Sequence, residues 1–184
     1  MQQLLDQIAR KAEERAMPTM LSIFADYHQI YLCDPAHNED WSALWTDETV
    51  DDRVVATPHT LVFSTGRNMM VPVTVIEHAA APDIEAMARD ADHVVAGSLR
   101  CSSGELKLAG CTDYLPDAFA MHMPPGLIGA AFLSFDLASI DPVDGLDGDD
   151  RYELYIWPTA QPVPVTVVQR WEPDAGQSAA GLHH

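Results

Sequence analysis

Short runs of alternating apolar and polar residues, separated by turn-forming residues, occupy most of the chain. Such runs, rich in aromatic and β-branched side chains, are typical of strands that bury one face. They recur at intervals of roughly 8 to 12 residues, which favours an antiparallel sandwich or barrel over alternating strands and helices. The predicted strands are 20–32, 54–64, 70–78, 94–101, 105–111, 119–123, 127–136, 152–157 and 163–171.

Two glycine-containing turns predict hairpins. The first turn, at 102–104, separates the fourth and fifth predicted strands, and the second, at 124–126, separates the sixth and seventh. Strands joined by so few residues usually pair as neighbours. Cys101 and Cys111 would then face each other across the first hairpin as buried, reduced side chains.

A helix is predicted near the start of the chain. The apolar residues of 2–16 recur at spacings of three and four, and Pro18 ends the pattern. This helix either packs against the domain or pairs two copies as a homodimer. We therefore predict a mostly β protein, an antiparallel β-sandwich of about nine strands with one N-terminal helix. The predicted parts are the helix over 1–17, the sandwich domain over 18–172 and a disordered tail over 173–184.

The net charge adds a strong constraint. The chain has 28 acidic and 10 basic residues, a formal net charge of -18. Residues 1–16 balance three acids with three bases, so the excess lies on the rest of the chain. A surface this negative repels nucleic acids and anionic membranes and attracts basic proteins. Solubility, or adaptation to a salty cytoplasm, is the alternative explanation of the charge.

Motifs for chemistry are sparse. The sequence has no catalytic-serine elbow, no phosphate loop and no histidine pair at a zinc-binding spacing. The three cysteines have no metal spacing, and the first residues do not form a signal peptide, so we expect a cytoplasmic protein. The Asp-rich loop 141–150 lacks the order of a calcium-binding EF-hand and is expected to be solvated. We expect no catalytic residue, no metal and no cofactor.

Acidic residues interleaved with aromatic ones are the remaining signal. Residues 26–52 contain eight acids and no lysine or arginine. Carboxylates steer and select a basic protein, and aromatic side chains anchor it. A solvated charged face is the alternative. The predicted partner-binding residues are Asp26, Tyr27, Tyr31, Asp34, Glu39, Asp40, Trp41, Trp45, Asp47, Glu48, Asp51, Asp52, Asp144, Asp147, Asp149 and Asp150.

Several segments together resemble the ComJ-type β-sandwich proteins, a family named for a competence-associated inhibitor of a nuclease. They are FADYHQIYLCD at 24–34 with Trp41 and Trp45 after it, VPVTVIEH at 71–78, SSGELKLAGCTDY at 102–114, PPGLIGAAFLSFDL at 124–137 and DRYELYIWP at 150–158. The resemblance covers 20–170. It implies a cytoplasmic binding protein that neutralises a basic nuclease or toxin and needs no catalytic residues.

The leading hypothesis is therefore a nuclease inhibitor or toxin-immunity protein that binds a basic partner. The alternative is an enzyme or small-ligand binder with a pocket inside the sandwich. Its first candidate residues are His28, His122, Asp113 and Tyr114. His28 could also join Asp34 and His37 in a site, whereas a structural, hydrogen-bonded histidine is the simpler interpretation.

Overall fold

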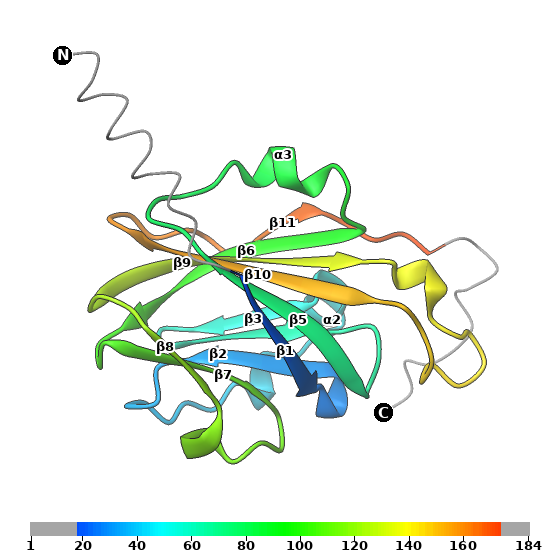
Figure 1. Cartoon of the computed structure of the whole chain (residues 1–184), viewed down its shortest axis with the longest axis horizontal. Helices are drawn as coiled ribbons and strands as arrows, with labels where there is room; N and C mark the ends of the chain where they lie inside the picture. The colour runs from blue at the N-terminus through cyan, green and yellow to red at the C-terminus, as the bar shows by residue number, and fades with distance from the viewer. Residues whose placement is uncertain (1–17, 174–184) are drawn as a thin grey trace.

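The computed structural model describes residues 18–173 and shows two β-sheets that face each other (Figure 1). The mostly β class predicted from the sequence is confirmed. The helix predicted over 2–16 and nearly all of the predicted tail lie outside the described residues, so pairing of two copies through that helix stays a prediction.

The described residues form eleven strands, two more than predicted. One sheet has six strands in the order β1-β5-β10-β9-β6-β11, and the other has five in the order β3-β4-β2-β7-β8. The strands are β1 Thr19–Phe24, β2 Gln29–Cys33, β3 Val54–Thr57, β4 Thr60–Ser64, β5 Met70–Glu77, β6 His93–Cys101, β7 Glu105–Gly110, β8 Phe119–His122, β9 Gly126–Phe135, β10 Arg151–Thr159 and β11 Thr166–Gln169.

Helical segments are short and lie in the connections. They are η1 Asp26–His28, η2 Ser42–Leu44, α2 Asp47–Asp52, α3 Ile84–Ala88, η3 Leu115–Asp117 and η4 Leu137–Ser139. None of the helices in the described part of the chain is long and apolar enough to cross a membrane.

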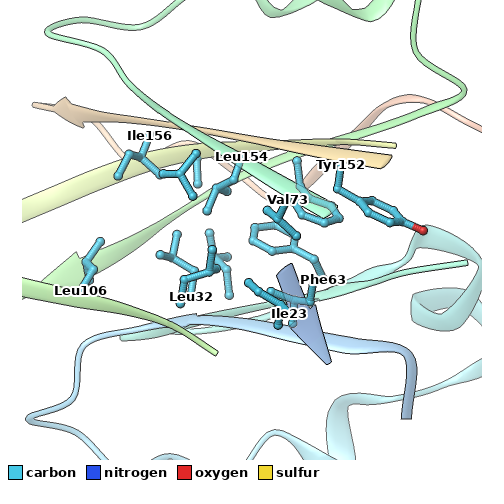
Figure 2. Packing of buried hydrophobic residues seen from close by; sticks show 14 of the residues in the cluster. Ile23, Leu32, Phe63, Val73, Leu106, Tyr152, Leu154 and Ile156 are labelled. Carbon is cyan, nitrogen blue, oxygen red and sulfur yellow. The ribbon is translucent and has the colours of Figure 1, made fainter. Parts of the chain in front are cut away.

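The hydrophobic core lies between the two sheets (Figure 2). Phe63 of the five-stranded sheet stacks on Phe132 of the six-stranded sheet, with ring centroids 4.7 Å apart. Phe132 in turn stacks on Tyr152, with centroids 5.3 Å apart. Burying an aromatic or aliphatic side chain of this size stabilises a fold by about 1.5–3 kcal/mol. This stack therefore joins the two sheets, close to the end of β4 and the start of β10.

The strand predicted over 20–32 is in fact two strands in different sheets. β1 pairs with β5 in the six-stranded sheet, and β2 pairs with β4 and β7 in the five-stranded sheet. Between them Tyr27 and His28 have φ values of 54° and 60°, in the left-handed region. These two residues end the pairing of β1 and redirect the chain.

Both predicted hairpins are wrong. β6 pairs with β9 and β11, whereas β7, on the other side of the turn, pairs with β2 and β8. The turn at 124–126 likewise joins β8 of one sheet to β9 of the other. Cys101 therefore lies opposite Gly126 rather than Cys111. Alternation of apolar and polar residues shows that one face of a strand is buried. It does not show in which sheet the strand lies, because both sheets bury their inner faces in the same core.

Two further details differ from the prediction. The strand predicted over 54–64 turns at Pro58 and His59 into the hairpin of β3 and β4. The six-stranded sheet is mixed: β10 runs parallel to β5, and all other neighbouring strands of this sheet are antiparallel.

A buried histidine links α2 to the C-terminal end of the described chain. The Nε2 of His93 lies 3.0 Å from the carbonyl oxygen of Asp52, and the backbone N–H of Trp171 donates to its Nδ1 at 3.1 Å. A carbonyl only accepts, so Nε2 carries the proton and the ring is neutral. Burial lowers the pKa of His93 from its ordinary 6.5 to about 4.

We predict that mild acid destabilises the fold through His93. Between pH 6.5 and pH 4 the unfolded chain binds a proton at this histidine and the folded chain does not, so the free energy of unfolding falls as pH falls. The expected loss is on the order of 3 kcal/mol. Urea unfolding at several pH values measures it. The His93→Gln variant should show a flatter profile, with His122→Gln, at an exposed histidine, as control. Equal slopes for wild type and His93→Gln would contradict the assignment.

Candidate protein-binding surface

The turn at 65–69, between β4 and β5, brings three acidic segments together. Thr65 N–H donates to the carbonyl of His28 at 2.8 Å, which ties η1 to this turn. Ser64, the last residue of β4 before this turn, donates its N–H to the carbonyl of Arg53 at 3.0 Å, which places the end of α2 beside the turn. Arg67 donates to the carbonyl of Leu146 at 3.1 Å, which ties the acidic loop 141–150 to it. We call this end of the sandwich the acidic end (Figure 1).

The acidic end gathers many of the predicted partner-binding carboxylates. They belong to Asp26 of η1, to Asp47, Glu48, Asp51 and Asp52 of α2, and to Asp144, Asp147 and Asp149 of the loop 141–150. Segments that are far apart in the sequence thus contribute to one region. The tertiary structure thus places their segments at one end of the sandwich, and the binding of a partner by these residues stays a prediction.

A buried polar network holds the acidic loop. Arg67 forms an ion pair with the carboxylate of Asp150, which is fully buried. The Tyr152 hydroxyl donates to the same carboxylate at 2.5 Å and accepts from Gly66 N–H at 2.7 Å. Burial and the neighbouring Asp150 charge raise the pKa of Tyr152, so its hydroxyl stays protonated and donating. Asp150, predicted to contact a partner, instead faces inward and holds the loop.

The arginines of the acidic end interact within the chain. Arg67 pairs with Asp150, and Arg170 pairs with Asp52. Arg151 lies 3.3 Å from Asp136 and over the ring of Phe135. Arg53 is half-buried, and desolvation lowers the pKa of its guanidinium. Three of these arginines thus pair with carboxylates of the chain, and the acids of this end outnumber its arginines.

Part of this acidity has a local structural role. Asp47 and Glu48 occupy the first turn of α2, where the helix dipole favours negative charge, and Thr46 caps the helix. Asp144 accepts the backbone N–H of Leu146 at 2.9 Å and closes a turn of the loop. The carboxylates thus stabilise the segments that display them.

Tyr27 is an exposed aromatic residue of this end. Its side chain is 68% exposed, and its left-handed backbone is a conformation that side chains other than glycine rarely adopt. Asp26 fixes this conformation by accepting the Tyr27 N–H at 3.0 Å. Strained backbone is concentrated at binding sites in proteins. Tyr27 and Asp26 therefore present an aromatic ring and a neighbouring carboxylate at this end, and their contact with a partner stays a prediction.

The other predicted residues lie elsewhere. Trp41 packs edge-on against Tyr31, with ring centroids 4.6 Å apart, and Trp45 is half-buried. Asp34 follows the far end of β2 and is fully buried, so its carboxylate is not displayed to a partner. Further predicted residues at that far end are Glu39 and Asp40.

A second polar cluster lies at this far end. Asp34, His37 and His59 place one possible ligand atom each within 4.8 Å of one another. The two imidazole rings are stacked, with centroids 3.5 Å apart. Sequence reasoning had considered Asp34 with His37 but missed His59. His59 lies 22 positions after His37 along the chain, and the pairing of β2 with β4 brings the two together.

Ser102 joins this cluster in a way that argues against a catalytic triad. Its hydroxyl lies 2.7 Å from a carboxylate oxygen of Asp34 and 2.8 Å from Nε2 of His37. The pKa of Asp34 is held well below its ordinary value: burial alone would raise it, and hydrogen bonds from Ser102, Ala36 and Ser103 outweigh that effect. The serine hydroxyl donates its hydrogen bond to the ionised carboxylate, so Nε2 of His37 donates to the serine oxygen and His37 does not act as the base of this serine.

The pocket of the alternative hypothesis does not form between His28 and His122. His28 precedes β2 at the acidic end, next to the Gly110 end of β7, whereas His122 lies opposite Glu105 at the other end of β7. A strand of this length spans roughly 17 Å. A groove of about 260 Å³ includes Asp113 and Tyr114 in its lining, but neither of these histidines.

Comparison with solved structures shows the same fold. One similar structure is ComJ of Bacillus subtilis, described as an inhibitor of the DNA-degrading activity of NucA. It has a TM-score of 0.57, 14% identity, and an alignment that covers 79% of this chain and 98% of ComJ. A second is the protein of crocagin biosynthetic gene J, with a TM-score of 0.51, 17% identity, and coverage of 79% and 97%. The resemblance inferred from the sequence is thus confirmed at the level of the fold. No family model and no curated protein matches the chain.

We predict that Arg67→Ala destabilises the protein by about 3–5 kcal/mol, the usual cost of leaving a buried charge without its partner. Asp150 would keep its carboxylate in the interior without a cation. Urea unfolding measures the change. Arg100→Ala, at an exposed arginine of β6, removes the same charge and should stay within about 0.5 kcal/mol of wild type. Similar losses in both variants would mean that net charge, and not the buried pair, is responsible.

Proposed function

We propose that this chain is a cytoplasmic binding protein that neutralises a basic nuclease or toxin, and that the acidic end is its docking surface. The observation that carries the proposal is the convergence of η1, α2 and the loop 141–150 on one turn. Their carboxylates present a large negative charge to a cationic partner, and Tyr27 adds an exposed aromatic ring.

The fold supports the nuclease as partner class. ComJ has the same fold and inhibits the DNA-degrading activity of a nuclease. A nuclease binds a polyanion, so its active surface is rich in lysine and arginine. A protein that displays clustered carboxylates can occupy that surface in place of phosphate groups. In this proposal inhibition is occlusion of the surface, and no residue of this chain performs catalysis.

The electrostatic nature of the proposed interface predicts a dependence on salt. Exposed charges interact through solvent, and at physiological ionic strength the screening length is about 8 Å. Complementary charge mainly raises the rate of association, and this gain falls as salt is added. A partner anchored chiefly by apolar contacts would show little of this dependence.

We predict that Glu48→Lys combined with Asp147→Lys lowers the rate of association with the partner by about tenfold or more at low salt. Both side chains are exposed, on α2 and on the acidic loop. The partners to test are nucleases encoded beside the gene for this chain, with NucA for comparison. Surface plasmon resonance gives the rate, and plasmid degradation gives the inhibition.

The matched control is Glu85→Lys combined with Asp83→Lys. These two exposed acids lie in the first turn of α3 and at its N-cap, outside the three segments of the acidic end, and the double change alters the net charge equally. We expect this control to retain nearly the wild-type rate. If both double variants lose the same rate, total charge matters and the acidic end is no specific surface. Unchanged binding in the first variant would exclude the acidic end as the docking surface.

A further inference from the structure

We propose that Asp34, His37 and His59 bind a divalent transition-metal ion of the zinc class, at the end of the sandwich away from the acidic end. The cluster is assembled from three places: Asp34 directly after β2, His37 in the following loop, and His59 in the turn between β3 and β4. This proposal is independent of the docking surface.

The distances in the cluster are close to those of a metal site. The three potential ligand atoms lie within 4.8 Å of one another, and Nε2 of His37 is 3.9 Å from Oδ2 of Asp34. Ligands at about 2.0–2.1 Å from a tetrahedral zinc ion are roughly 3.4 Å apart. Closing the site therefore requires the side chains to approach by about 1 Å.

The donor set selects the class of ion. Two imidazoles and one carboxylate suit zinc and neighbouring first-row ions, whereas calcium and magnesium prefer oxygen ligands. Three protein ligands leave a coordination position for water or for a group of a bound partner. Because His37 and Ser102 are at the surface, that position is accessible from solvent.

His59 is held with a lone pair available for a metal ion. Its Nδ1 lies 2.9 Å from the backbone carbonyl of Arg100, so Nδ1 carries the proton in the neutral ring and Nε2 does not. A carbonyl that fixes the far nitrogen in this way is the usual support of a metal-binding histidine. Its backbone is fixed as well: its N–H donates to Glu39 at 3.0 Å, and its carbonyl accepts Asp34 N–H at 3.0 Å.

Asp34 supplies the negative charge of the site. Its oxygens accept hydrogen bonds from Ser102 N–H at 2.6 Å, Ser103 N–H at 3.2 Å and Ala36 N–H at 3.0 Å. These bonds keep the carboxylate ionised and fix its orientation. A carboxylate that is held in place in its anionic form loses little conformational entropy when it binds a cation.

His37 is the ligand that has to move. Its ring is nearly parallel to that of His59, at 12°, whereas an ion bound to both nitrogens has to lie near both ring planes. His37 stands at the surface in a loop, so its ring can turn out of the stack. It then gives up the hydrogen bond to Ser102 and carries its proton on Nδ1, which leaves Nε2 to the ion.

Titration with Co²⁺, followed by visible absorption, and competition with Zn²⁺ test the site. The protein used is the full chain with His183→Ala and His184→Ala, because the terminal histidine pair can itself bind these ions. We predict one ion per chain. Loss of a group that only supports a metal ligand lowers metal affinity by about tenfold to hundredfold. His37→Ala and His59→Ala each remove a direct ligand, so each should lower the affinity for the ion by more than this.

The matched control is His122→Ala, which removes an exposed histidine of β8. This variant should bind as tightly as the parent, and circular dichroism establishes that every variant is folded. Absence of a bound ion in the parent chain would overturn the proposal. So would a loss of affinity in His122→Ala as large as that in His37→Ala and His59→Ala.

Discussion

The buried carboxylate of Asp150 is the interaction on which the acidic end depends. It lies in the interior at the start of β10, where an unpaired charge would be very costly. Arg67 and Tyr152 compensate it, and Arg67 also holds the acidic loop through the carbonyl of Leu146. One internal ion pair thus fixes a loop whose exposed carboxylates repel one another. The exposed carboxylates of the acidic loop are therefore held at the surface by a buried carboxylate that Arg67 neutralises.

The two ends of the sandwich use carboxylates in different ways. At the acidic end they are mostly exposed, their neighbours are other acids, and their effect on a partner acts over several ångströms through solvent. At the other end Asp34 is buried, held by N–H and O–H donors and placed beside two imidazoles. The first arrangement suits steering of a macromolecule, and the second suits a small cation. Strand β2 runs from one end to the other and connects them.

The errors in strand pairing share one physical cause. Period-two alternation shows that a strand buries one face, but not in which sheet the strand lies. The predicted strand 20–32 and the predicted hairpins at 102–104 and 124–126 failed for this reason, since both sheets bury residues in one core. The break at Tyr27 was also hidden, because a left-handed tyrosine has no signature in composition. His59 was missed because its neighbours come from β2 and β6.

The sequence by itself determined the mostly β class, the approximate positions of most strands and the excess of negative charge. These properties follow from local periodicity and from composition, which a chain carries before it folds. Only the tertiary structure decided which acids are displayed, which are buried with Arg67 or Ser102, and which histidines meet. Such groupings depend on pairings between strands distant in sequence and on crossings between the two sheets. Local patterns do not encode these long-range contacts.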